Sequence, residues 1–137
     1  MRTLGRRALL WGAVAVLAAT VHAGAAGGGA DRFDSILAIA EKNVGTPAGA
    51  AYDQAFGQAM QAQLGMQMAK CFTRTPNPDL AKFDMLVQVD ASGKASEVLL
   101  RPETNVALCF RPRIGEAAFP EPPRPAYWVH VEMDVTR

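Results

Sequence analysis

The chain has 137 residues, of which 50% are hydrophobic, 20% are charged and 7% are aromatic. That length allows one domain, or one domain with short appendages. A formal net charge of +1 argues against a dedicated nucleic-acid binder, and a mean hydropathy of +0.04 excludes a wholly disordered polar chain.

The first 23 residues have the pattern of an export signal. Arg2, Arg6 and Arg7 form a basic start, an uncharged run from Ala8 to Val21 follows, and small residues precede a cleavage point after Ala23. The run is shorter than the roughly 20 apolar residues that a membrane-spanning helix needs. We therefore expect a cleaved signal peptide and a periplasmic location. An uncleaved signal that anchors the protein in the inner membrane is the alternative.

Cleavage would change the charge of the protein. It removes three of the 14 basic residues and leaves 11 against 13 acidic residues, a net charge of −2. Attraction to nucleic acid or to a membrane surface then loses its support, and no membrane span is expected in the mature chain. His22 is also removed, so His130 is the one histidine left, which excludes any site that needs two.

Two cysteines, Cys71 and Cys109, remain in the mature sequence. In an exported protein with an even number of cysteines, a disulfide is the default. The bridge would close a loop of about 39 residues and stabilise the fold by roughly 4 kcal/mol. A metal pair or a reactive thiol is the alternative, but neither cysteine has a CxxC spacing or a local activating partner.

Two helices are expected in the first half of the mature chain. Apolar residues at helical spacing predict a helix over Asp31–Val44, with Asp31 as its N-cap. A long amphipathic helix is expected over Pro47–Lys70, with Thr46 as N-cap and the proline at the first position, where its missing N–H costs nothing. Cys71 then lies at the end of this helix.

Beyond two prolines, the period of the hydrophobic pattern changes from 3.6 to 2. Alternating residues predict a strand over Phe83–Val89, a turn at Asp90–Gly93 and a second strand over Ala95–Arg101. Together they form a hairpin. A short helix is expected from Asn105 to about Phe110, because Pro112 limits or kinks it.

Four prolines between Phe119 and Pro125 require an extended segment, and a last strand is expected over Tyr127–Val135. The order predicts an α+β fold, with N-terminal helices followed by a β-β-α-β unit and a three-stranded antiparallel sheet. The expected organisation is a signal peptide over 1–23, a short linker and first helix over 24–45, and an α+β domain over 46–137. Its two helices would cover one face of the sheet and leave the other solvated.

The hairpin and the final strand also carry a familiar pattern. It reads FDMLVQVDASGKASEVLLRPETNVALCF from Phe83, then FPEPP from Phe119 and YWVHVEMDV from Tyr127, with Cys71 upstream. This pattern resembles the TonB C-terminal-like domain, within it the small exported branch that has one cysteine before the hairpin and one in the following helix. The resemblance covers about Gln67 to Val135, half of the chain.

This resemblance implies an α+β fold with a short three-stranded sheet, and a protein that pairs an extended peptide with an open sheet edge. TonB energy transducers keep a membrane anchor and a long proline-rich spacer. Here Gly24–Ala30 spans roughly 25 Å at most, and the helical region Asp31–Lys70 stands in place of the spacer. We therefore expect the fold without energy transduction.

No pattern in the sequence indicates catalysis, a metal or a cofactor. His130 alone cannot complete a nucleophilic triad, and Glu132 and Asp134 fit the polar side of a strand as well as they fit acid–base work. Thioethers suit copper(I), but methionines also fill cores. The methionines concerned are Met60, Met66, Met68, Met85 and Met133. We expect a protein that is not an enzyme.

The expected binding surface combines the open sheet edge with the segment from Phe119 to Tyr127. Tyr127 and Trp128 are adjacent, so one of these two aromatic side chains points away from the core, and Arg124 is a charged residue among prolines. The expected binding residues are Arg124, Tyr127, Trp128 and His130. The alternative for Trp128 is that it covers the far face of the sheet.

Three functions follow from this reading. The leading one is a periplasmic protein-interaction module that binds a segment of an envelope or outer-membrane protein. The second is an inhibitor or immunity-type protein that blocks an envelope hydrolase. A protruding acidic loop with Asp79 or Glu103 would favour this second function. The third is an enzyme, for which no nucleophile–base pair is visible. The sequence leaves the oligomeric state open.

Overall fold

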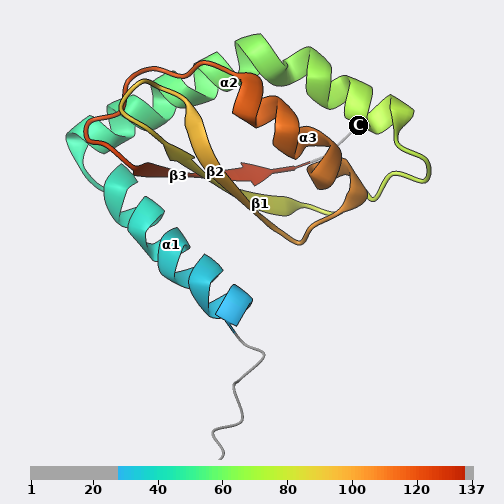
Figure 1. The fold of residues 1–137 in the computed structure, drawn as a ribbon, viewed down its shortest axis with the longest axis horizontal. Helices are drawn as coiled ribbons and strands as arrows, with labels where there is room; N and C mark the ends of the chain where they lie inside the picture. The colour runs from blue at the N-terminus through green and yellow to red at the C-terminus, as the bar shows by residue number, and fades with distance from the viewer. Residues whose placement is uncertain (1–27, 135–137) are drawn as a thin grey trace, which may run out of the picture.

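The computed structural model describes residues 28–134. The expected signal peptide, and Val135 at the end of the expected last strand, lie outside these residues. The elements, in chain order, are α1 (Gly28–Val44), α2 (Pro47–Arg74), β1 (Phe83–Val89), β2 (Ala95–Arg101), α3 (Asn105–Glu116) and β3 (Tyr127–Met133) (Figure 1). The expected α+β fold with a three-stranded antiparallel sheet is confirmed. Within the described range, no helix has the length and apolar character to cross a membrane.

β1 lies at the centre of the sheet because it pairs with both other strands. The order is β2-β1-β3, and both pairings are antiparallel. The hairpin between β1 and β2 turns at Gly93, whose φ of 82° suits glycine. A Cβ atom at this position would also lie 2.1 Å from the carbonyl oxygen of Phe119. Within the described part of the chain, β2 and β3 each have one side without a partner strand.

Helices cover both faces of the sheet. α2 and α3 form a core with one face, whereas α1 packs on the other face, against β3 and β1 (Figure 1). The expectation that one face is solvated is therefore wrong for the part of the sheet under α1. The physical reason is that this face carries large apolar side chains of its own, which α1 removes from water.

The larger core lies between α2, α3 and the sheet, and aromatic rings connect it to the proline-rich segment. The ring of Phe56 stacks on that of Phe119 with 4.3 Å between centroids. The ring of Tyr52 meets that of Tyr127 edge-on at 5.1 Å, and its hydroxyl donates to the carbonyl oxygen of Pro120 at 2.9 Å. α2 therefore holds this segment at both of its ends.

A disulfide joins the end of α2 to α3. The Sγ atoms of Cys71 and Cys109 are 2.09 Å apart, and Cys71 is buried in the larger core. The predicted pairing is confirmed, and no free cysteine occurs among residues 28–134. The bridge holds the two helices on the same face of the sheet.

The second core lies under α1. It consists of Phe33 and Ala40 from α1, Leu86 from β1 and Trp128 from β3. The Trp128 side chain is only 6% exposed. The expectation that Trp128 points to solvent is therefore wrong, and its alternative role, covering the far face of the sheet, describes its position.

Three of the six predicted helix ends agree with the structure, namely the end of α1 and the starts of α2 and α3, whereas α2 continues past the predicted Lys70 to Arg74. Thr46 caps α2 as expected, since its Oγ1 accepts from the N–H of Gly49 at 3.0 Å. Asp31 is not an N-cap, because the backbone is already helical from Gly28. α3 continues past Pro112 to Glu116, because Pro112 is exposed on the outer side while buried residues on either side of it hold the helix to the core.

Candidate functional site

The structure brings three of the four expected binding residues to one place but buries two of them. Tyr127 and Trp128 are 4% and 6% exposed, and together with His130 they line a small cavity of about 110 Å³ between α1, α2 and β3. Arg124 is exposed, and with Tyr127 it lines a wider surface hollow of about 490 Å³ that includes Lys42. The buried aromatic side chains stabilise the fold and do not present a surface.

Arg124 contributes to a polar contact that closes the start of the β3 edge. Its guanidinium donates to Oδ1 of Asn43 at 2.7 Å, and Nδ2 of Asn43 donates to the carbonyl oxygen of Trp128 at 3.0 Å. Asn43 is placed by the tight connection between α1 and α2, where a Cβ atom on Gly49 would lie 1.8 Å from its carbonyl oxygen. The Asn43 amide therefore occupies a position that an added strand would otherwise take.

The Asn43 contact also shows which backbone groups of β3 face outward. In an antiparallel strand, the N–H and C=O of one residue point to the same side, and successive residues alternate. Because the carbonyl of Trp128 points away from β1, those of His130 and Glu132 do so as well. The free part of the β3 edge therefore begins at His130.

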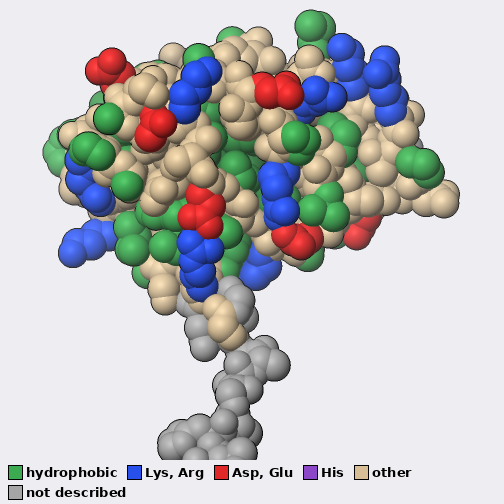
Figure 2. All heavy atoms as spheres, viewed as in Figure 1, with side chains coloured by type: hydrophobic (Ala, Val, Ile, Leu, Met, Phe, Trp, Pro, Cys, Tyr) green, Lys and Arg blue, Asp and Glu red, His purple; other side chains and the backbone are tan. Residues whose placement is uncertain are grey.

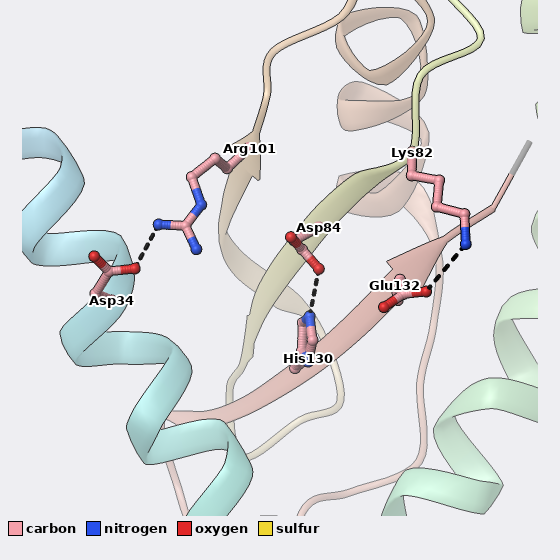
Figure 3. Close-up of polar contacts among 6 residues, drawn as sticks. All are labelled: Asp34, Lys82, Asp84, Arg101, His130 and Glu132. Atoms are coloured by element: carbon pink, nitrogen blue, oxygen red, sulfur yellow. Dashed lines mark hydrogen bonds and ion pairs between the residues drawn. The ribbon is translucent and has the colours of Figure 1, made fainter.

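His130 lies on the face of the sheet that carries α1, at a position that α1 covers only in part. Its Nε2 is 2.9 Å from Oδ1 of Asp84, and both side chains are about one-third exposed or less, at 27% and 33%. Lys82 pairs with Glu132 at 3.8 Å (Figure 3) and also with Asp134 at 2.9 Å. These cross-strand pairs align β1 with β3.

The two tyrosines beside the β3 edge have shifted ionisation. Burial raises the pKa of Tyr52 to about 12, and the neighbouring Tyr127 adds to the effect. Burial also raises the pKa of Tyr127, while the positive charge of Arg124 opposes the shift. Both phenols therefore stay neutral well above physiological pH, where they serve as ring contacts and as a hydrogen-bond donor.

The open edge of β2 forms a second candidate site, which sequence reasoning missed. A groove of about 430 Å³ runs along its C-terminal half, between α1 and α3. Leu99 and Leu100 both line it, although they point to opposite faces of the sheet, so the groove lies against the strand edge itself. Its three arginines come from three separate segments of the chain, so no local pattern in the sequence indicated it.

The backbone at this second edge also faces outward. The backbone carbonyl of Trp128 points away from β1, so Gln88, its partner in β1, directs its backbone N–H and C=O to β2. The hydrogen bond from the Asp90 N–H to the carbonyl of Lys94 follows the same alternation. In β2, the residues left pointing away from β1 are then Val98 and Leu100. The start of β2 is covered, since Phe119 N–H donates to the Gly93 carbonyl at 2.8 Å.

The fold and its two edges define a small disulfide-linked α+β protein whose edge strands, β2 and β3, each have outward-facing backbone N–H and C=O groups. Among residues 28–134, no group of three or more His, Cys, Asp or Glu side chains is arranged to hold a metal ion. A scan against models of protein families gave no match, and searches of curated proteins and of solved structures likewise returned no similar protein.

Proposed function

We propose that this protein is a non-enzymatic interaction module that binds an extended segment of an envelope protein at an open edge of its sheet. The observation that carries the proposal is the strand order β2-β1-β3, which leaves outward-facing backbone groups on β2 and β3. Unpaired strand edges accept extended peptides through main-chain hydrogen bonds. A three-stranded sheet with helices packed on both faces has its edges left for recognition.

We also propose a TonB C-terminal-like fold and a periplasmic location. The support for the fold is the order hairpin, helix, strand, with one cysteine before the hairpin and its partner in the helix. The disulfide, and the lack of a membrane-crossing helix among residues 28–134, are compatible with an exported protein. Export itself rests on the pattern of residues 1–23.

The acidic residues that would suit an inhibitor serve contacts within the protein. Oδ1 of Asp79 accepts from the N–H of Ala81 at 3.0 Å, and the carboxylate of Glu103 pairs with Arg111. No feature of the described residues favours the inhibitor over edge binding.

Photo-crosslinking in living cells tests edge binding. A photoreactive residue at Glu132 reports on the β3 edge, and one at Glu103 reports on the groove beside β2. Gln61, which is exposed on α2, is the matched control position. We expect one edge position to capture a defined envelope protein through an extended segment, identified by mass spectrometry. Equal capture from Gln61, or capture from neither edge, would contradict the proposal.

A further inference from the structure

Arginines line the groove beside β2. Its lining includes three arginines, Arg32, Arg101 and Arg111, against one acidic residue, Glu103. Figure 2 shows hydrophobic surface on this side of the molecule, flanked by places where acidic and basic side chains touch. Counted with their carboxylate partners Glu97, Asp34 and Glu103, the three arginines leave the rim without net charge. An apolar floor edged by guanidinium donors still suits a ligand that combines apolar groups with carboxylates.

Two of the arginines are oriented by carboxylates outside the groove. Arg32 pairs with Glu97 at 2.7 Å, and Arg101 pairs with Asp34 (Figure 3). The guanidinium of Arg101 also lies over the ring of Phe33, with 4.1 Å to the ring centroid. A guanidinium has five N–H donors in a fork, so one carboxylate partner leaves donors for a second. These pairs hold the arginines in place without using all of their donors.

The third arginine is incompletely satisfied. The guanidinium of Arg111 pairs with Glu103, but its Nε–H is buried and has no hydrogen-bond partner in the described part of the chain. Buried donors without a partner are rare in folded proteins. The Arg111 side chain as a whole is 37% exposed, so a shift of this side chain would bring the Nε–H to an incoming acceptor.

From this geometry, and resting on the proposed function, we infer that the β2 edge is the binding edge and that its ligand is an acidic extended segment. The segment adds as a strand beside β2, and its backbone pairs with the outward groups of Val98 and Leu100. Its apolar side chains contact Phe33 and the leucines of the groove, while its carboxylates meet the arginines.

The β3 edge is less suited to this role. Asn43 already bonds the carbonyl of Trp128, and the cavity lined by Trp128 and His130 measures about 110 Å³ against about 430 Å³ beside β2. The wider hollow of about 490 Å³ reaches β3 only at Tyr127, before the free part of the edge. The free part of β3 also carries Glu132, with Asp134 directly after the strand, and Lys82 pairs with both carboxylates. The β2 edge therefore offers three guanidinium groups to an incoming carboxylate, whereas the free part of the β3 edge offers one amine that already has two carboxylate partners.

A peptide-binding experiment tests the inference. It uses protein that is expressed from the complete chain and then purified. The probes are a short peptide of alternating valine and aspartate and its counterpart of alternating valine and lysine. We expect the acidic peptide to shift the backbone amide NMR signals of Val98 and Leu100 and to slow their hydrogen exchange. Arg32→Gln with Arg111→Gln should weaken binding roughly tenfold, about threefold for each arginine. Arg113→Gln, on the outer side of α3, is the matched control.

A second variant blocks the strand edge without removing a charge. Val98→Pro removes an outward N–H and is tolerated at an edge, because that N–H does not bond β1. It should abolish binding of the acidic peptide, whereas Glu132→Pro should leave that binding unchanged. Equal binding of both peptides, or competition by free aspartate at the same concentration, would overturn the inference in favour of nonspecific or small-anion binding.

The same experiment separates this inference from the proposed function. If the acidic peptide shifts the amides of His130 and Glu132 instead, the β2 assignment is overturned while edge binding stands. If neither peptide shifts either edge and in-cell crosslinking captures nothing, both are overturned.

Discussion

Replacing Trp128 by alanine tests whether α1 and β3 share a core. A buried tryptophan side chain removes roughly 200 Å² from water, which corresponds to about 5 kcal/mol at about 25 cal/mol per Å². Compact unfolded chains already bury part of this area, and a reduction by about a third leaves about 3 kcal/mol. The cavity left under α1 adds to the loss. We therefore expect Trp128→Ala to lower the free energy of unfolding by at least about 3 kcal/mol.

Urea denaturation followed by circular dichroism measures this loss. In a thermal melt of Trp128→Ala, the same loss should lower the melting temperature by roughly 12 °C or more for a domain of this size. Trp128→Phe keeps an aromatic ring in the same space and should lose less. Leu108→Ala, at a position that is 44% exposed on α3, is the control and should stay within about 0.5 kcal/mol of the original protein. A loss below about 1 kcal/mol for Trp128→Ala would refute the packing of α1 on the sheet.

Three further predictions concern the disulfide, the ionisation of Tyr52 and the contact of Asn43 with the β3 edge. Under denaturing conditions without reductant, thiol titration should find no free thiol, and Cys71→Ser with Cys109→Ser should cost about 4 kcal/mol in urea denaturation. The folded-state pKa of Tyr52 is raised, so its contribution to stability is full below pH 10 and is lost as pH rises toward 12. Thermal melts across that range should show a smaller decline in Tyr52→Phe. Asn43→Ala should cost about 1 kcal/mol, seen in urea denaturation, because the Trp128 carbonyl loses its partner.

The local elements could be predicted because each has a short-range signal. The alternation in β1 and β2, the turn at Gly93 and the Thr46 cap depend on neighbouring residues, and all agree with the structure. The disulfide followed from the number of cysteines. The extension of α3 past Pro112 was missed, because burial of residues on both sides of the proline outweighs one lost hydrogen bond.

The position of α1 could not be predicted with the same rules. The pattern showed that α1 has an apolar stripe, but not which surface it covers. The signal that could have located it was the set of large apolar side chains at Leu86, Leu99 and Trp128, which alternation places on one face of the sheet. Polar residues on the same face, such as His130, favoured the interpretation of that face as solvated. Trp128 was consequently expected on a binding surface, although α1 buries it.

The groove beside β2 could not be recognised from sequence because its walls are far apart in the chain. Arg32, Arg101 and Arg111 come from α1, β2 and α3, and each looks like a solvated charge in its own element. Only the packing of α1 across the sheet brings Arg32 to the same groove as Arg111.

The most direct test of edge binding is the affinity of the captured partner for edge-blocked variants. Isothermal titration would compare the original protein, Val98→Pro, Glu132→Pro and the double variant, each checked for fold by circular dichroism. Edge binding predicts that the double variant loses the partner, and the arginine-lined groove predicts that Val98→Pro alone suffices. Full affinity in all three variants would contradict the claim that this protein recognises its partner through an open strand.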